Sequence, residues 1–240
     1  MNLIWHRPAK VYNLSTDGVE VWQAEFGLLS EHLEEFEQVL SPDEQERARR
    51  YRQKRDHVRF VGARGVLRMI LAGYLGVSPS EVEFSYSERG KPFLKANSTG
   101  IEFNVSHSED KALLAIALNR RVGIDVEYIR PIEVLSLAKR FFQESEYSLL
   151  STFEGMEQLR GFFQLWTAKE AYLKAIGEGL AGLETVEISL SELESAESLE
   201  IHNTGCDWIL QSLELGEDYC AAIAVEGKAS QVNCWQFNIR

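Results

Sequence analysis

The sequence lacks the features of a membrane or secreted protein. Its longest apolar run, ALLAIAL at 112–118, has seven residues, whereas a membrane-spanning helix needs about 20. The N-terminal stretch MNLIWHRPAKVYNLSTDG contains no apolar segment of the kind that a signal peptide requires. There are only three cysteines, Cys206, Cys220 and Cys234, and their spacing fits no metal site. We therefore expect reduced thiols in a cytoplasmic protein that does not enter a membrane.

Basic residues are missing from one long stretch of the chain. Residues 175–227 contain twelve acidic residues and no Lys or Arg, so this stretch accounts for the whole net charge of −12. By contrast, the segment RARRYRQKRDHVRFVGARGVLR at 47–68 holds nine basic residues and one Asp. Such a cluster indicates either binding to phosphates or to an acidic partner, or a solvated helix face. We do not expect nucleic acid as a partner, because the rest of the chain would repel it.

The common motifs of nucleotide-binding and hydrolytic sites are also missing. The sequence has no G-x4-G-K-[ST] loop and no G-x-S-x-G elbow. Ser106 and His107 are adjacent, so on a strand their side chains point to opposite faces and cannot pair as nucleophile and base. A nucleotide would have to be bound by other means, and Lys91, in the turn RGKPF, and His107 are candidates for contacting a phosphate.

What the sequence does contain is a repeated pattern. The segments ARGVLRMILAGYLGVSPSEVEFS (63–85) and AKEAYLKAIGEGLAGLETVEISL (168–190) each predict an amphipathic helix, a glycine-rich end and a strand. A hairpin pattern follows each of them. We therefore predict an α+β fold of two similar halves, residues 1–120 and 121–240, with the cleft between them as the place for a site.

An acidic pair stands on a predicted strand in RVGIDVEYIRP, residues 121–131. Asp125 and Glu127 share one face of this strand, roughly 7 Å apart, and two neighbouring carboxylates repel each other. The pair is either the solvent face of a sheet or part of a Mg²⁺ site that needs a third oxygen ligand. Glu170 is the candidate for that ligand, with Lys174 one helical turn later on the same face. The alternative for Glu170 and Lys174 is a surface ion pair worth roughly 0.2–0.5 kcal/mol.

Taken in order, the segments RGKPF, FNVSHS, GIDVE, RFFQESEY and LWTAKEAYLKAIGEGL resemble motifs of the 4′-phosphopantetheinyl transferase superfamily, in its larger, surfactin-type branch. The resemblance covers residues 41–190. It implies two α+β halves, each an antiparallel sheet with a helix, related by a pseudo-twofold axis. It also implies an enzyme that moves the phosphopantetheine group of coenzyme A to a serine of an apo acyl or peptidyl carrier protein, releasing 3′,5′-ADP. Two fused halves would complete the site in a monomer.

The resemblance also implies roles for individual residues. Asp125, Glu127 and Glu170 would bind Mg²⁺, or Mn²⁺ in its place, and Lys174 would stabilise the leaving phosphate. Glu146, in RFFQESEY, matches the family's general base for the serine proton. The remaining matched positions would bind coenzyme A: Arg47, Arg59, Gly90, Lys91, Pro92, Ser106 and His107.

Two alternative functions stay open on the sequence. The chain could be a member of the same fold that binds carrier proteins or coenzyme A without catalysis, or an unrelated Mg²⁺-dependent nucleotide hydrolase. Glu44 stands where some relatives have Lys, which leaves one phosphate contact of the family open. The sequence does not indicate which carrier proteins are preferred, or a role for the acidic stretch 184–200.

Overall fold

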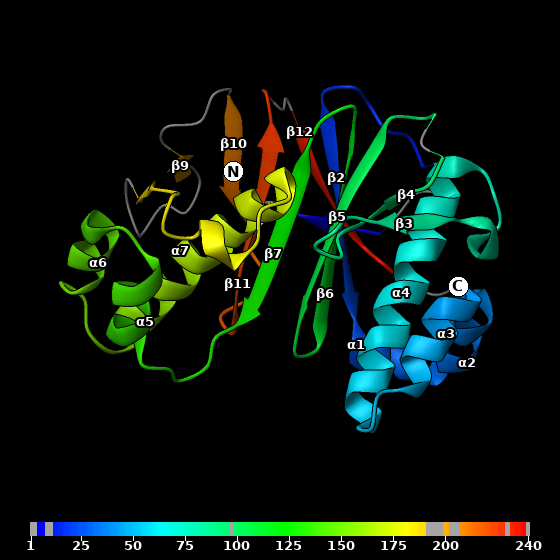
Figure 1. The fold of residues 1–240 in the computed structure, drawn as a ribbon, viewed down its shortest axis with the longest axis horizontal. Coiled ribbons are helices and arrows are strands. Elements are labelled where there is room, and N and C mark those ends of the chain that lie inside the picture. Colours follow the sequence, from blue (N-terminus) through cyan, green and yellow to red (C-terminus); the bar gives the residue numbers. More distant parts are fainter. Residues whose placement is uncertain are drawn as a thin grey trace.

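The computed structural model describes residues 4–7, 12–96, 98–190, 199–201, 207–228 and 231–238. Cys206 and residues 191–198 of the acidic stretch 184–200 lie outside the described residues. Two sheets lie at the centre of the molecule, and the long helices cover their outer faces (Figure 1). Among the described residues, no helix has the length and apolar content to cross a membrane.

The first sheet has five strands in the order β1–β12–β2–β6–β5. These strands are β1 (Trp5–His6), β2 (Gly18–Glu25), β5 (Ile101–Ser108), β6 (Lys111–Leu118) and β12 (Gln231–Gln236). The helices on its outer side are α1 (Phe26–Leu29), α2 (Leu33–Val39), α3 (Pro42–Arg49) and α4 (Lys54–Leu75). A separate hairpin follows α4, formed by β3 (Phe84–Tyr86) and β4 (Pro92–Leu94). Together these elements form the first half of the molecule.

The second sheet is antiparallel, with five strands in the order β7–β11–β10–β9–β8. Its strands are β7 (Val122–Tyr128), β8 (Ile188–Leu190), β9 (Leu199–Ile201), β10 (Trp208–Ser212) and β11 (Tyr219–Glu226). The accompanying helices are α5 (Val134–Phe141), α6 (Glu144–Leu150) and α7 (Gly155–Ile176). A strand, helices, a long helix and then four strands thus follow one another in both halves, and the predicted α+β fold of two similar halves is confirmed.

The C-terminal strand departs from this division. β12 lies in the first sheet, parallel to both β1 and β2, although it belongs to the range 121–240. The position has a physical reason, because β2 would otherwise end the sheet with a row of unpaired backbone groups. Cys234 on β12 is buried among residues of both sheets. Burial raises the pKa of the free Cys220 and Cys234 thiols to about 12, so both stay protonated at neutral pH.

The two sheets pack face to face, and a helix covers the outer face of each. Val21 and Ala115 of the first sheet share one apolar core with Ile124 and Ile223 of the second. Successive strand residues alternate between this inner core and the core beneath a long helix. For this reason β6, with the sequence KALLAIAL, is apolar on both faces and is buried along most of its length.

At the junction of the halves, side chains replace a backbone ladder. β5 ends the first sheet and β7 ends the second. Three N–H groups of β7 donate to side-chain oxygens of β5: Ile124 to Asn104 Oδ1 at 3.0 Å, Val126 to Ser106 Oγ at 3.4 Å, and Tyr128 to Ser108 Oγ at 3.0 Å. The alternating polar residues of FNVSHS therefore satisfy backbone donors that an edge strand leaves without partners.

Helix α7 lies directly on β7 at Gly123. A Cβ atom at this position would stand 2.0 Å from the Ala171 carbonyl oxygen and 2.5 Å from the Ala175 nitrogen. Both atoms belong to the helix backbone and cannot turn aside. The glycine of GIDVE is therefore required by the close approach of a helix to a strand.

We expect Gly123→Ala to lower the free energy of unfolding by about 1–3 kcal/mol or more, since the added methyl group has no space. Chemical denaturation of the variant and the parent protein measures the difference. Gly179→Ala is the matched control, because a Cβ there meets no atom within 4 Å and the backbone φ is −94°. Equal stability of the Gly123 variant and the parent would contradict the close approach.

Candidate functional site

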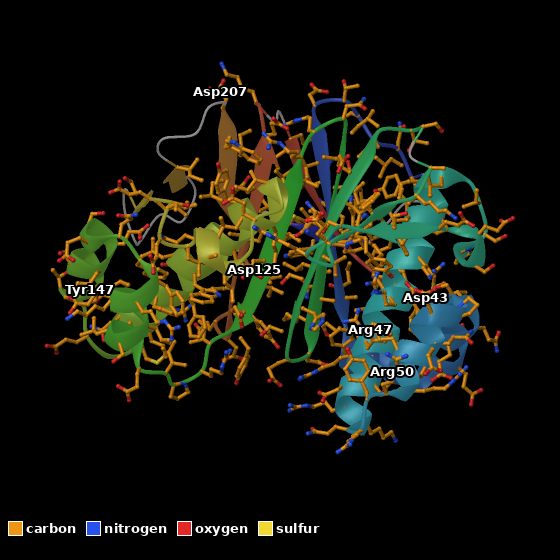
Figure 2. All side chains as sticks on the ribbon, in the orientation of Figure 1. Asp43, Arg47, Arg50, Asp125, Tyr147 and Asp207 are labelled. Atoms are coloured by element: carbon orange, nitrogen blue, oxygen red, sulfur yellow. The ribbon has the colours of Figure 1, made fainter. Side chains whose placement is uncertain are left out.

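A lysine and a buried aspartate form the centre of a polar cluster where the halves meet. The Lys174 ammonium on α7 lies 2.6 Å from Asp125 Oδ1 on β7 and donates to Ser106 Oγ at 2.9 Å. The Ser106 hydroxyl itself donates to Asp125 Oδ1 at 2.8 Å. Asp125 lies near the centre of the molecule, between α7 and the two sheets (Figure 2). The first acidic residue of GIDVE is therefore held by both halves.

Glu127 is held by the next serine of the same motif. Ser108 Oγ donates to Glu127 Oε2 at 3.0 Å, and Arg130 lies 3.3 Å from that oxygen. Each of the two serines accepts a backbone N–H of β7 and donates to a carboxylate of the same strand. FNVSHS thus orients both carboxylates as well as the strand that carries them.

Glu170 completes the acidic cluster from α7. Burial raises the pKa of this carboxyl, the nearby charges of Asp125 and Glu127 raise it further, and Lys174 opposes them. Within the described residues, Glu170 Oε1 and Asp125 Oδ2 are buried and accept no hydrogen bond. The cluster therefore has more negative charge than Lys174 alone can balance.

The chemistry of this donor set fits a divalent cation. Carboxylate oxygens are the protein ligands that Mg²⁺ prefers, and two buried oxygens here have no other partner. As they stand, no three His, Cys, Asp or Glu side chains in the described part of the chain are arranged to hold a metal ion. One oxygen of Asp125 is taken by the Lys174 ammonium in this arrangement. The unpartnered oxygens are the stronger indication of a cation site. Ligand side chains can rotate toward an ion, whereas a buried carboxylate oxygen without a hydrogen-bond partner is energetically unfavourable.

A cavity lined by cations and aromatic rings lies in the first half. Its volume is about 190 Å³, and its lining residues are Arg47, Tyr51, Phe60, Ala63, Arg64, Leu67, Pro92, Val105 and His107. The Arg47 guanidinium lies over the Phe60 ring at 5.1 Å. His107 connects this cavity with the acidic cluster: burial lowers the pKa of its imidazole, and the charges of Lys174 and Arg59 lower it further.

A larger cavity of about 490 Å³ lies elsewhere, between α2, α3 and the start of α4. It is lined by acidic and amide side chains together with Arg49 and His57. It contains none of the predicted site residues. The smaller cavity is the relevant one because its lining includes the predicted residues Arg47, Pro92 and His107.

Four of the seven predicted coenzyme A residues do not line the cavity: Arg59, Gly90, Lys91 and Ser106, of which Ser106 belongs to the acidic cluster. The Lys91 ammonium donates to the Lys174 carbonyl at 2.6 Å and to the Ala175 carbonyl at 3.4 Å, at the C-terminal end of α7. Burial lowers its pKa. Gly90, at φ +81°, forms the turn that brings Lys91 there. Arg59 forms an ion pair of 2.6 Å with Glu109 in the turn between β5 and β6. The assignments of Lys91 and Arg59 to coenzyme A stay predictions.

Glu146 is buried in the second half and is 2% exposed. It caps its own helix, because Glu146 Oε2 accepts the Gln143 N–H at 2.8 Å, and its Oε1 accepts the Ile188 N–H at 2.9 Å. Glu146 Oε2 also lies 2.6 Å from the ammonium of Lys169, which is fully buried. Its neighbour Glu144 is exposed. The general-base role of Glu146 stays a prediction, and it concerns a carboxylate whose two oxygens are already engaged.

Other residues of the site were not singled out from the sequence. Ser108 and Asn104 were not named, although they alternate with Ser106 in FNVSHS and this alternation was available as a signal. Arg64 was hidden among the nine basic residues of 47–68, yet it lies over Phe60, Phe84 and Tyr86 at 5.5–6.0 Å. Glu44 is 2% exposed and pairs with Arg68 at 2.7 Å, so it takes part in the core of the first half.

Comparison with protein families follows the two halves. Residues 121–224 match the family described as "4′-phosphopantetheinyl transferase superfamily", and residues 25–119 match "4′-phosphopantetheinyl transferase, N-terminal". The chain belongs to the 4′-phosphopantetheinyl transferase superfamily. The two matched regions meet at the boundary between the two halves and contain one long helix each, while β1, β12 and nearly all of β2 lie outside them.

Individual members of the superfamily are similar over most of the chain. The 4′-phosphopantetheinyl transferase HetI of Nostoc sp. is 42% identical over 227 residues, which cover 93% of this chain and 94% of that protein. The 4′-phosphopantetheinyl transferase Sfp of Bacillus subtilis is 30% identical over 82% of this chain and 86% of its own length. A solved holo-(acyl-carrier-protein) synthase of Bacillus anthracis is more distant, at 21% identity and a TM-score of 0.38, over 44% of this chain and 93% of that one.

The raised pKa of Glu170 has a consequence for stability in the absence of a metal. Because the folded protein holds this proton more tightly than the unfolded chain does, stability falls as the pH rises through the range between the two pKa values. We expect Glu170→Gln, which is neutral at every pH, to raise the melting temperature in EDTA near pH 8 and to change it little near pH 4. Scanning calorimetry at both pH values measures this. The exposed Glu144→Gln is the control, and a Glu170 variant that is less stable near pH 8 would contradict the assignment.

Proposed function

We propose that this chain transfers the 4′-phosphopantetheine group of coenzyme A to a serine hydroxyl of an apo carrier protein, releasing 3′,5′-ADP. The observation that carries the proposal is the proximity of two different environments: a buried acidic cluster, and a cavity lined by arginines and aromatic rings whose lining residue His107 is within range of the Lys174 charge. Coenzyme A has the matching parts, since its adenine ring and its phosphates require stacking surfaces and cations, and its pyrophosphate requires charge neutralisation.

The first half supplies the nucleotide site in this proposal. Phe60 and Tyr51 offer aromatic faces to the adenine ring, and Arg47 and Arg64 offer guanidinium groups to the phosphates. Arg59 stands nearby and would exchange its exposed partner Glu109 for the 3′-phosphate. His107 lines the cavity within range of the Lys174 charge, and it marks the direction in which the pyrophosphate would extend.

The second half supplies the reacting end. Asp125, Glu127 and Glu170 would hold Mg²⁺, which would neutralise the charge of the pyrophosphate when bound. In the reaction a bond forms between the serine Oγ and the phosphorus atom, the bond from phosphorus to the oxygen of 3′,5′-ADP breaks, and the serine proton leaves to solvent water. Lys174 would then stabilise the negative charge left on the departing phosphate, because its ammonium group already lies in this cluster. Ser106 and Ser108 keep the carboxylates in place throughout.

The finer features of the proposal concern the setting of the reaction. We infer a monomer, because both environments are complete within one chain, and we infer activity in the cytoplasm on carrier proteins of fatty-acid, polyketide or peptide synthesis. Binding of coenzyme A without transfer and hydrolysis of a nucleotide are the alternatives that an experiment has to exclude.

Mass spectrometry of an apo carrier protein incubated with the chain, coenzyme A and Mg²⁺ tests the function. We expect the carrier protein to gain the mass of one phosphopantetheine group, and Asp125→Asn, Glu170→Gln or excess EDTA to abolish the gain. Asp207→Asn is the control, because this exposed carboxylate lies far from Asp125 (Figure 2). Cleavage of coenzyme A without a modified carrier protein would indicate a hydrolase, and binding without cleavage a non-catalytic member.

Arg59 gives a second test, directed at the nucleotide site. We expect Arg59→Ala to weaken the binding of coenzyme A more than that of 3′-dephospho-coenzyme A, by about 1.5–3 kcal/mol for the lost charged contact. Titration calorimetry with both ligands measures the difference. Arg50→Ala is the control, since this exposed arginine is paired with Glu46 and lies outside the cavity lining. Equal losses for the two ligands would remove Arg59 from the 3′-phosphate.

A further inference from the structure

Each half of the molecule contains a buried ion pair of the same kind. In the first half Glu44 lies 2.7 Å from Arg68, and their exposed fractions are 2% and 1%. In the second half Glu146 lies 2.6 Å from Lys169, with exposed fractions of 2% and 0%. Buried charges of this kind are rare and need close partners.

The two acidic partners occupy equivalent positions in short helices. Glu44 is the third residue of α3, and its carboxylate accepts the backbone N–H of the capping residue Ser41 at 3.1 Å. Glu146 is the third residue of α6, and its carboxylate accepts the N–H of the capping residue Gln143 at 2.8 Å. Both acids therefore belong to a capping box that starts the helix.

The two basic partners are equivalent as well. Arg68 stands eight residues before the left-handed Gly76 that ends α4, and Lys169 stands eight residues before the left-handed Gly177 that ends α7. Each also donates to two carbonyl groups after its helix: Arg68 to Pro79 at 3.2 Å and Val82 at 2.8 Å, and Lys169 to Leu183 at 3.1 Å and Val186 at 2.6 Å. Val82 and Val186 begin the repeated segments VEFS and VEIS. The pairs are thus two copies of one structural device.

The first copy stands in a half without the reacting carboxylates. Asp125 is paired with the fourth residue of β11, and Trp22 is paired with the fourth residue of β6, so Trp22 occupies the position of Asp125. Counted back from the glycine that ends each helix, Met69 corresponds to Glu170 and Gly73 to Lys174. The ion pair is therefore present where no carboxylate cluster exists, and its presence does not depend on proton transfer.

In the second half the Glu146–Lys169 pair lies on the side of α7 that faces away from β7. Residues of an α-helix are about 100° apart, so Lys169 is about 160° from Ala171, whose carbonyl packs against Gly123 of β7. Glu170 and Lys174 lie on the flank between these two contacts. Gly123 fixes how close α7 comes to β7, and the Glu146–Lys169 pair fixes the rotation of α7 about its axis.

We propose that Glu146 and Lys169 are positioning residues: they hold α7 at the rotation in which Glu170 and Lys174 meet Asp125, and Glu146 does not accept the serine proton. Both Glu146 oxygens already accept backbone N–H groups, and its carboxylate is closed to a serine hydroxyl from another protein. This inference rests on the proposed function, and it replaces the general-base role that the resemblance implies.

The test compares single and double variants of the two pairs. Glu146→Gln and Lys169→Met each leave one buried charge without its partner, whereas the double variant leaves none. We expect both single variants to lower the melting temperature, to weaken Mg²⁺ binding measured by calorimetry in the presence of coenzyme A, and to slow transfer to a similar extent. The double variant should recover all three, with turnover within about tenfold of the parent, because a general base is worth 10²–10⁴-fold and that loss should not occur.

The first-half pair is the matched control. Glu44→Gln should lower the melting temperature to a similar extent. Because Glu44 also lies 3.7 Å from Arg64 of the cavity, Mg²⁺ binding is compared at saturating coenzyme A, where it should stay at the parental value since Glu44 does not orient α7. This comparison separates positioning of the acidic cluster from general destabilisation. Equal loss of Mg²⁺ binding in the Glu44 and Glu146 variants would contradict the positioning role.

Two outcomes would overturn the proposal. A double variant that melts and binds Mg²⁺ like the parent, yet transfers 10²–10⁴-fold more slowly, would show that Glu146 is the base. If the double variant does not fold, the single variants decide: fast transfer by Lys169→Met together with slow transfer by Glu146→Gln would also make Glu146 the base. Failure of the proposed function is distinguishable, because the parent chain would then modify no carrier protein while the Mg²⁺ and melting results would still apply to the pair.

Discussion

The arrangement of the whole site depends on hydrogen bonds from the β7 backbone to the side chains of β5. Two edge strands from different sheets meet there, and three side-chain oxygens take the place of the carbonyl groups that a sheet partner would offer. If β5 and β7 were joined by backbone hydrogen bonds instead, Ser106 and Ser108 would have no role in orienting the carboxylates. Because each hydroxyl both accepts and donates, the position of the strand and the direction of its acidic side chains are fixed by the same atoms.

The acidic cluster also shows how a repeated fold acquires one specialised copy. In each half an equivalent long helix lies on an equivalent strand. Small and charged residues line this contact in the second half, whereas aromatic residues line it in the first. Trp22 donates its indole N–H to the Tyr74 hydroxyl at 3.1 Å, and Tyr12 stacks on Trp22. The same backbone arrangement thus supports packed aromatic rings in the first half and a cluster of mutually repelling carboxylates in the second. Burial and this repulsion together raise the pKa of Glu170.

Much of this could be predicted from the sequence, for identifiable reasons. The repeat, the acidic pair on a strand and the partner residues Glu170 and Lys174 follow from periodicities of two and of about 3.6, which short segments reveal. The environments of Glu146 and Lys91 could not be predicted in this way. Glu146 differs from the exposed Glu144 through contacts with Lys169 and Ile188, 23 and 42 positions later in the sequence, and Lys91 is directed by a turn whose target lies on the other half. Contacts between distant segments leave no trace in local periodicity. For the same reason, the place of β12 in the first sheet could not be predicted.

The place of β12 has a consequence for how the protein is made. During synthesis the first half emerges with β2, β5 and β6 able to pair, but the other edge of β2 can be covered only when residues 231–236 have left the ribosome. Until then an open strand edge is exposed for association with other chains. Because β2 and β12 are separated by more than two hundred residues, their pairing also closes a very long loop and is expected to come late. The first half is thus synthesised first, yet its sheet is among the last parts of the fold to be completed.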